Sequence, residues 1–179
     1  SVIAKVRDRY IQDMANEKDP KLIFALNLIK DWNLSADSSN TAAALVLISL
    51  PNAFNENNLK YETDAITSKL VESIDYLENK FGRIDVPLGK VLRLVRGETN
   101  LPLSGGPGLL RAIYFKKKND TYVGIAGDCY FQAVEWGPNG ELNAWTIHQY
   151  GSATAIESSI HYDDQAKLFS KHEMKQVRP

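Results

Sequence analysis

The sequence predicts an α+β fold in which helices come first and an antiparallel sheet follows. Apolar residues recur at helical spacing through residues 1–84, whereas β-branched and aromatic residues gather in short runs from residue 85 onward. Turn residues separate these runs, which keeps the strands short. We therefore expect a helical region at 1–84 and an antiparallel sheet region with a C-terminal helix at 85–179, folded as one compact unit.

Local signals place the first three helices. A stripe of apolar residues runs through residues 2–14. Asp19 is expected to cap the second helix, with Pro20 at its first position. The third helix, 42–50, is apolar almost all round and is stopped by Pro51, so we expect it to be covered on several sides.

The fourth helix has the clearest pattern in the chain. Its apolar residues repeat every three to four positions up to Phe81. Thr63 or Asp64 is expected to cap its start, and Gly82 is placed to end it. The Asn-rich segment 52–58 before it predicts a loop.

Four runs in the second half predict strands joined by short turns, at residues 110–115, 122–125, 130–136 and 145–150. A short helix or strand is expected near residues 91–95. Short turns between consecutive strands imply an antiparallel meander. Residues 130–136 carry apolar side chains on both faces, which predicts a sheet covered on both sides. The chain holds too little helix to cover both.

Charge and hydropathy exclude several classes of partner. The net charge of −1 gives no footprint for nucleic acid or an anionic membrane, and no apolar run is long enough to span a bilayer. Residues 116–118, all Lys, precede an Asn119-Asp120 turn and predict a solvated hairpin tip. Cys129 is the only cysteine, which excludes an internal disulfide.

Two residues could act as nucleophiles. An N-terminal serine can attack with its own α-amino group as base, but Ser1 is followed by helical sequence, and we interpret it as a cleavage end. Cys129 and His148 lie on neighbouring predicted strands and could pair as nucleophile and base. No cationic cluster surrounds Cys129, so a buried structural cysteine is the preferred interpretation.

The remaining polar clusters have structural interpretations. His161, Asp163 and Asp164 match no standard zinc or calcium spacing, and the two carboxylates are expected to cap a helix. Residues 105–108, Gly-Gly-Pro-Gly, lack the lysine of a phosphate cradle and predict a sharp turn. The residues themselves thus predict no catalytic, cofactor or metal site in this chain.

Several segments nevertheless form an ordered series. Residues 86–97 contain Pro-Leu-Gly and end in Arg-Gly, and residues 101–106 read Leu-Pro-Leu-Ser-Gly-Gly. Residues 127–136 read Gly-Asp-Cys-Tyr-Phe-Gln-Ala-Val-Glu-Trp, and residues 159–169 contain His-Tyr-Asp-Asp-Gln before Leu-Phe. This order resembles the C-terminal part of the β-chain of the penicillin acylase family, N-terminal-nucleophile amidohydrolases that include acyl-homoserine lactone acylases. Residues 26–32 fit the family less specifically.

Three positions depart from the family pattern. Ser104 stands where a histidine is common, Cys129 replaces the usual serine, and Ile160 occupies a position that is typically proline. All three fall in structural motifs.

The resemblance implies an αββα sandwich and hydrolysis of the amide bond of N-acylated small molecules, penicillins or acyl-homoserine lactones, by a periplasmic or secreted enzyme. In the family the first serine of the β-chain is the nucleophile and its own amine is the base. An Asn side chain and a backbone N–H hold the oxyanion, and calcium is bound by some members. These groups lie upstream of the matched segments, so none is carried onto this chain.

As an inert fragment of the enzyme, the chain would have as partners the α-chain and the N-terminal part of the β-chain of the same precursor, and the intact enzyme would bind a small N-acyl substrate. Two alternatives to this interpretation remain. A non-catalytic binding or assembly module on the same scaffold is the second hypothesis, because an uncovered sheet face is a ready docking surface. A free-standing hydrolase that uses Cys129 is the third.

Overall fold

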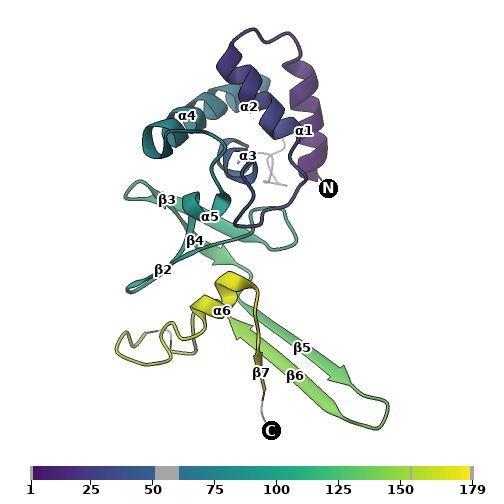
Figure 1. Cartoon of the computed structure of the whole chain (residues 1–179), viewed down its shortest axis with the longest axis vertical. Coiled ribbons are helices and arrows are strands. Elements are labelled where there is room, and N and C mark those ends of the chain that lie inside the picture. Colours follow the sequence, from purple (N-terminus) through teal and green to yellow (C-terminus); the bar gives the residue numbers. More distant parts are fainter. Residues whose placement is uncertain (1, 51–60, 154, 178–179) are drawn as a thin grey trace. The chain divides into compact units, whose positions relative to one another are not determined.

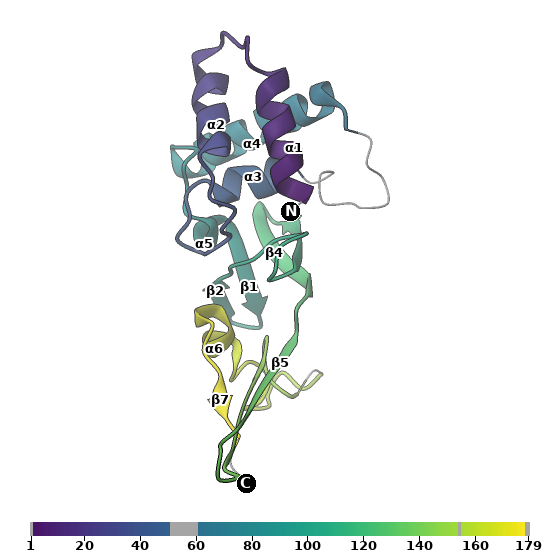
Figure 2. The same cartoon turned by 90° about the vertical axis from the view of Figure 1, so that its right-hand side faces the viewer.

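The computed structural model describes residues 2–50, 61–153 and 155–177, which belong to two compact units (Figures 1 and 2). One unit contains Ser1–Val91 and Ser104–Ala112, and the other contains Leu92–Leu103 and Ile113–Pro179. Helices precede the strands, and a further short helix lies near the C-terminus before the last strand, so the α+β prediction is confirmed.

The first unit is helical and is built around a buried helix. Its helices are α1 (Val2–Asp13), α2 (Pro20–Lys30), α3 (Ala43–Ser49), α4 (Thr63–Phe81) and α5 (Leu88–Val91). Every residue of α3 is buried, and α3 contacts α2, α4 and α5. The predicted covering of this apolar helix is therefore confirmed. The predicted stop at Pro51 and the loop at 52–58 lie outside the described residues.

Side chains and one glycine set the helix ends. The Asp19 carboxylate accepts hydrogen bonds from the backbone N–H groups of Lys21 and Leu22, at 2.8 and 3.4 Å, as an N-cap does. Gly82 ends α4 with φ +73°, a left-handed conformation that glycine adopts without steric strain. Both predictions are confirmed. The N-cap position of α4 is Glu62, one residue before Thr63 and two before Asp64, and it makes no side-chain capping bond, so the predicted cap of α4 is wrong.

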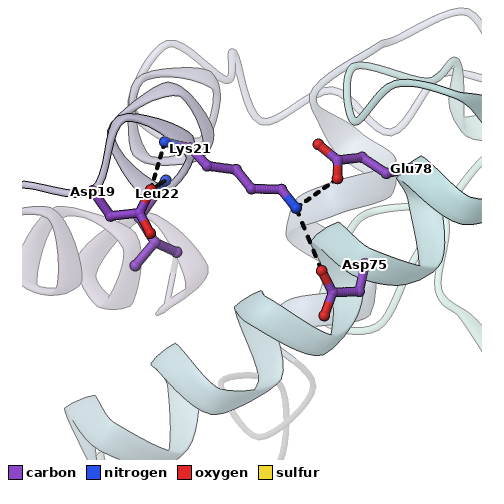
Figure 3. A network of polar contacts seen from close by, with 5 residues as sticks. All are labelled: Asp19, Lys21, Leu22, Asp75 and Glu78. Carbon is purple, nitrogen blue, oxygen red and sulfur yellow. Dashed lines mark hydrogen bonds and ion pairs between the residues drawn. The ribbon is translucent and has the colours of Figure 1, made fainter.

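An ion-pair cluster on the surface joins α2 to α4 (Figure 3). Lys21 Nζ lies 2.5 Å from Glu78 Oε2 and 3.4 Å from Asp75 Oδ1. The hydrogen bond that Lys21 donates to Glu78 is the main reason why the pKa of Lys21 is raised. Because the three groups are exposed, we assign them a role in aligning the two helices and not in core stability.

The second unit holds two sheets and a helix. One sheet has the order β2-β1-β4-β3, with β1 (Leu92–Arg96), β2 (Thr99–Pro102), β3 (Ile113–Lys118) and β4 (Thr121–Gly127). The other has the order β5-β6-β7, with β5 (Tyr130–Trp136), β6 (Leu142–His148) and β7 (Lys175–Gln176). Helix α6 (Ala166–Lys171) contacts β2 and β6.

The pairs β1–β2, β3–β4 and β5–β6 are antiparallel hairpins, whereas β4 and β5, which follow each other in the predicted meander, lie in different sheets. Asn119 and Asp120 form the β3–β4 turn with φ +43° and +61°, a pair of left-handed residues that matches the twist of the strands. The β1–β4 pair is parallel, and the strands divide into two sheets between β4 and β5. Local turn chemistry does not encode these two features.

The β5–β6 hairpin exposes apolar side chains on both faces. Residues paired across an antiparallel ladder share a face, so one face, the Trp136 face, carries Tyr130, Val134, Trp136, Leu142 and Ala144. The opposite face, the Phe131 face, carries Phe131, Ala133, Trp145 and Ile147. Trp136 is 73% exposed and Leu142 63%. The predicted covering on both sides is not supplied by the described residues.

The α2 cap gives a stability prediction. Asp19→Ala removes the acceptor for two helix N–H groups and should lower the free energy of unfolding by about 1 kcal/mol. Asp31→Ala is the matched control, because Asp31 lies at the opposite end of α2, where a carboxylate faces the negative end of the helix dipole. Urea unfolding should show a loss for Asp19→Ala and no loss for Asp31→Ala. Equal losses would contradict the capping role.

The hydrogen bonds of Asp13 make the folding stability depend on pH in the acidic range. Hydroxyls of Tyr61 and Thr63 donate to Asp13 Oδ2 at 2.6 and 2.9 Å, and these bonds lower the pKa of Asp13. A lowered folded-state pKa stabilises the protein above the ordinary aspartate value, and this contribution is lost as pH falls through the folded value. Asp13→Asn should therefore flatten the fall in Tm below about pH 4. An unchanged pH profile would exclude this contribution.

Candidate functional site

The second unit contains a cavity of about 280 Å³ where β4 leads into β5. Its apolar wall is formed by Leu94, Leu103, Ile113 and Phe169, and its polar lining includes Asp128, Cys129, Gln149 and Tyr150. Cys129 is exposed, so the prediction of a buried structural cysteine is wrong. The reason is that β5 starts at the rim of the cavity and is not covered there.

Cys129 and His148 do not form a nucleophile–base pair. The residue across from Cys129 is Gln149, whose backbone N–H donates to the Cys129 carbonyl at 3.1 Å. His148 is paired with Tyr130, and their ring centroids are 4.9 Å apart. Because successive side chains of a strand point to opposite faces, the thiol and the imidazole lie on different faces of the ribbon. The other nucleophile considered, Ser1, lies outside the described residues.

Residues 149–165, the closing segment, follow β6 and hold strands of the second unit together. Gln165 is 3% exposed, and its side-chain Oε1 accepts the backbone N–H of His148 at 3.1 Å. Its own backbone N–H donates to the Tyr150 carbonyl at 2.7 Å. Gln165 therefore continues the hydrogen bonding of β6 on the edge that faces β7, beyond the last β6–β7 pair at Thr146 and Lys175. This role was not predicted, because a buried glutamine has no distinctive sequence pattern.

His161, Asp163 and Asp164 also act within this closing segment. Thr99 of β2 donates a short hydrogen bond to Asp163, and His161 Nδ1 lies 3.0 Å from Asp164 Oδ2. Helix α6 begins only at Ala166, and its N-cap makes no side-chain capping bond. The predicted capping by the two aspartates is therefore wrong. Their carboxylates tie the loop to β2 and to itself.

Arg96 at the end of β1 is held between two tyrosine rings. Its guanidinium carbon lies 4.0 Å from the ring centroid of Tyr162 and 4.9 Å from that of Tyr150. Burial is the main cause of the raised pKa of Tyr150, and Arg96 opposes it. Stacking on both rings fastens the closing segment to the β1–β2 hairpin.

Gly151 and Gly106 lie where a side chain does not fit. A Cβ on Gly151 would lie 2.1 Å from the His161 carbonyl oxygen, so the closing segment crosses its own backbone there. In the helical unit, a Cβ on Gly106 would lie 2.7 Å from Leu47 Cδ2 of the buried helix α3. Next to it, Ser104 is buried and its hydroxyl accepts the backbone N–H of Ser38 at 2.9 Å. Residues 104–106 thus pack a loop onto α3.

Neither a metal-binding cluster nor a membrane-spanning helix is found among the described residues. Across residues 2–50, 61–153 and 155–177, no three acidic, histidine or cysteine side chains are grouped so as to hold a metal ion. Among the helices of the described part of the chain, none has the length and hydropathy needed to cross a bilayer. The possible calcium site of an intact enzyme stays a prediction.

These contacts define a helical unit and a strand unit, and in the strand unit the closing segment holds the strands together. The sequence matches the penicillin amidase family over residues 2–178, which is nearly the whole chain. The chain therefore belongs to the penicillin amidase family and carries an acylase-like amidohydrolase scaffold. No curated protein matches it.

The role of Gln165 as acceptor for the His148 N–H can be tested by substitution. Gln165→Leu keeps a similar volume and removes the acceptor for the His148 N–H, so the free energy of unfolding should fall by about 1–3 kcal/mol. Lys167→Leu, at an exposed position two residues away, is the control and should leave stability nearly unchanged. This stabilising role of Gln165 is excluded if chemical denaturation gives the same midpoint for both variants.

Proposed function

We propose that this chain is the C-terminal structural portion of a penicillin-acylase-like amidohydrolase. The intact enzyme cleaves the amide bond of N-acylated small molecules, penicillins or acyl-homoserine lactones. The observation that carries this proposal is the family match over residues 2–178. Family membership also supports a periplasmic or secreted location for the intact enzyme.

The reacting groups belong to polypeptide upstream of this chain. In the resembled family, the hydroxyl of the first β-chain serine attacks the amide carbonyl, the amine leaves, and water then releases the acyl group from the serine ester. The serine's own α-amino group carries the proton. Separation of Cys129 from His148 on opposite faces supports a scaffold role for the described residues.

The β5–β6 hairpin supports the same proposal. Within the described residues the hairpin is extended only by the two-residue strand β7, and it exposes Trp136 and Leu142 on one face and Phe131 on the other. Burying these side chains against the α-chain and the N-terminal part of the β-chain would remove apolar surface from water. The partners proposed are therefore the other parts of the same precursor.

A non-catalytic binding or assembly module is the second candidate. The exposed Trp136 face favours it, because a large apolar side chain at 73% exposure is typical of a docking surface. The residue at the processing junction of the intact precursor distinguishes the two candidates. A serine there supports the amidohydrolase, and its absence supports the binding module.

The proposal predicts that activity requires more than these 179 residues. The intact gene product should release amine from penicillin or acyl-homoserine lactone substrates, whereas the isolated chain should give only the uncatalysed rate. Cys129→Ala in the intact protein should leave the rate unchanged, because the thiol has no adjacent base. Turnover by the isolated chain would refute the proposal. Loss of that turnover in Cys129→Ala would identify the thiol hydrolase instead.

A further inference from the structure

The loop that joins β5 to β6 contains the only Asn-Gly pair of the sequence (Figure 1). Residues 137–141 form this loop, and the Gly140 N–H donates to the Gly137 carbonyl at 3.1 Å. Pro138 is the second residue of the resulting turn, and Gly140 closes the turn with φ +88°. Asn139 therefore lies at the tip of the turn, directly before a residue without a side chain.

The tip of this turn is open to water. Asn139, Gly140 and Glu141 are all exposed, and a Cβ added to Gly140 would meet no atom within 4 Å. Glycine is also the residue whose backbone has the widest conformational freedom. The Gly140 nitrogen therefore meets little steric hindrance in approaching the Asn139 side chain.

The Glu141 carboxylate restrains that side chain. Its Oε1 accepts a hydrogen bond from Asn139 Nδ2 and its Oε2 accepts one from the Asn139 N–H, both at 3.1 Å. The backbone N–H of Glu141 and these two bonds from Asn139 lower the pKa of Glu141, so the acceptor is ionised at neutral pH. The Gly140 N–H is directed at the Gly137 carbonyl, so the carboxylate is not placed to remove its proton.

We propose that Asn139 is a site of spontaneous deamidation in the folded protein. The Gly140 nitrogen forms a bond to Asn139 Cγ, the Cγ–Nδ2 bond breaks, and ammonia leaves with the proton of the Gly140 N–H. Water then opens the resulting succinimide ring. Cleavage between the Gly140 nitrogen and Cγ gives aspartate, and cleavage between this nitrogen and the main-chain carbonyl carbon of Asn139 gives isoaspartate. The reaction needs only this chain and water, so it is independent of amidohydrolase activity.

Either product disturbs the turn. A carboxylate at position 139 has lost the Nδ2 donor and repels the Glu141 carboxylate. Isoaspartate also adds a methylene group to the main chain between Gly137 and Gly140, whose hydrogen bond closes the turn. Because this turn sets the Trp136–Leu142 end of the hairpin, the modified hairpin should fray at that end.

Mass spectrometry of the aged protein tests the proposal. The intact gene product is kept in warm, mildly alkaline buffer and digested, and fragment spectra then distinguish asparagine, aspartate and isoaspartate at each position. Asn139 should be converted to aspartate and isoaspartate. Asn119 and Asn143 should stay unmodified over the same time, because the side chains of Asp120 and Ala144 hinder the attacking nitrogen.

Two variants test the restraint by Glu141. Glu141→Ala should speed the modification of Asn139 by about threefold, a modest factor because the acceptor is exposed. Glu135→Ala removes an exposed carboxylate of β5 outside the turn and should leave the rate unchanged. Equal rates in the two variants, or slower modification in Glu141→Ala, would overturn the restraining role.

A synthetic peptide of residues 134–144 provides the rate without the folded turn. Modification of Asn139 in the folded protein at a rate within about tenfold of the peptide supports the proposal, because local opening of an exposed turn costs little free energy. Modification of the peptide with an unchanged Asn139 in the folded protein would overturn it. Modification of Asn119 or Asn143 as fast as that of Asn139 would overturn it as well.

Discussion

The β5–β6 hairpin carries apolar side chains on two faces, and the described residues add to its sheet only the two-residue strand β7. One end of the ribbon is secured. Phe131 packs near Phe169 of α6, with ring centroids 6.4 Å apart, and Ile147 is buried. The other end, with Trp136 and Leu142, has no such cover in the described chain. This imbalance is the physical basis for the proposal that the chain docks on further polypeptide.

The closing segment keeps the ribbon in place. Gln165 replaces a strand at the end of β6, Asp163 holds β2, and Arg96 lies between the rings of Tyr150 and Tyr162. Each contact joins segments that are distant in sequence. The His-Tyr-Asp-Asp-Gln run, whose residue types invite a metal or catalytic interpretation, is explained by backbone and loop contacts. Its polar residues satisfy hydrogen bonds at strand ends, where a buried amide without an acceptor is destabilising.

Features with a local cause could be predicted from the sequence. Asp19-Pro20, Gly82 and Asn119-Asp120 act through their own backbone conformation or the next few N–H groups, so their positions are sufficient. The parallel β1–β4 pair and the division into two sheets depend on contacts between distant segments, which periodicity does not encode.

The same distinction holds for the site. The exposure of Cys129 and the roles of Asp163 and Asp164 depend on which elements lie beside them, and the local pattern predicted burial and capping instead. Family membership could be predicted, because it rests on the order of several segments and not on any one residue. The buried Ser104 shows that a departure from the family pattern can keep a structural role, since its hydroxyl still satisfies a backbone N–H.

The most direct measurement is to locate the reacting nucleophile of the intact gene product. The active protein is labelled with a serine-directed sulfonyl fluoride until activity is lost, and the modified peptide is then identified by mass spectrometry. A stoichiometric label outside residues 1–179 is the predicted result. A stoichiometric label on Ser1, or on any other residue of this chain, would contradict the account.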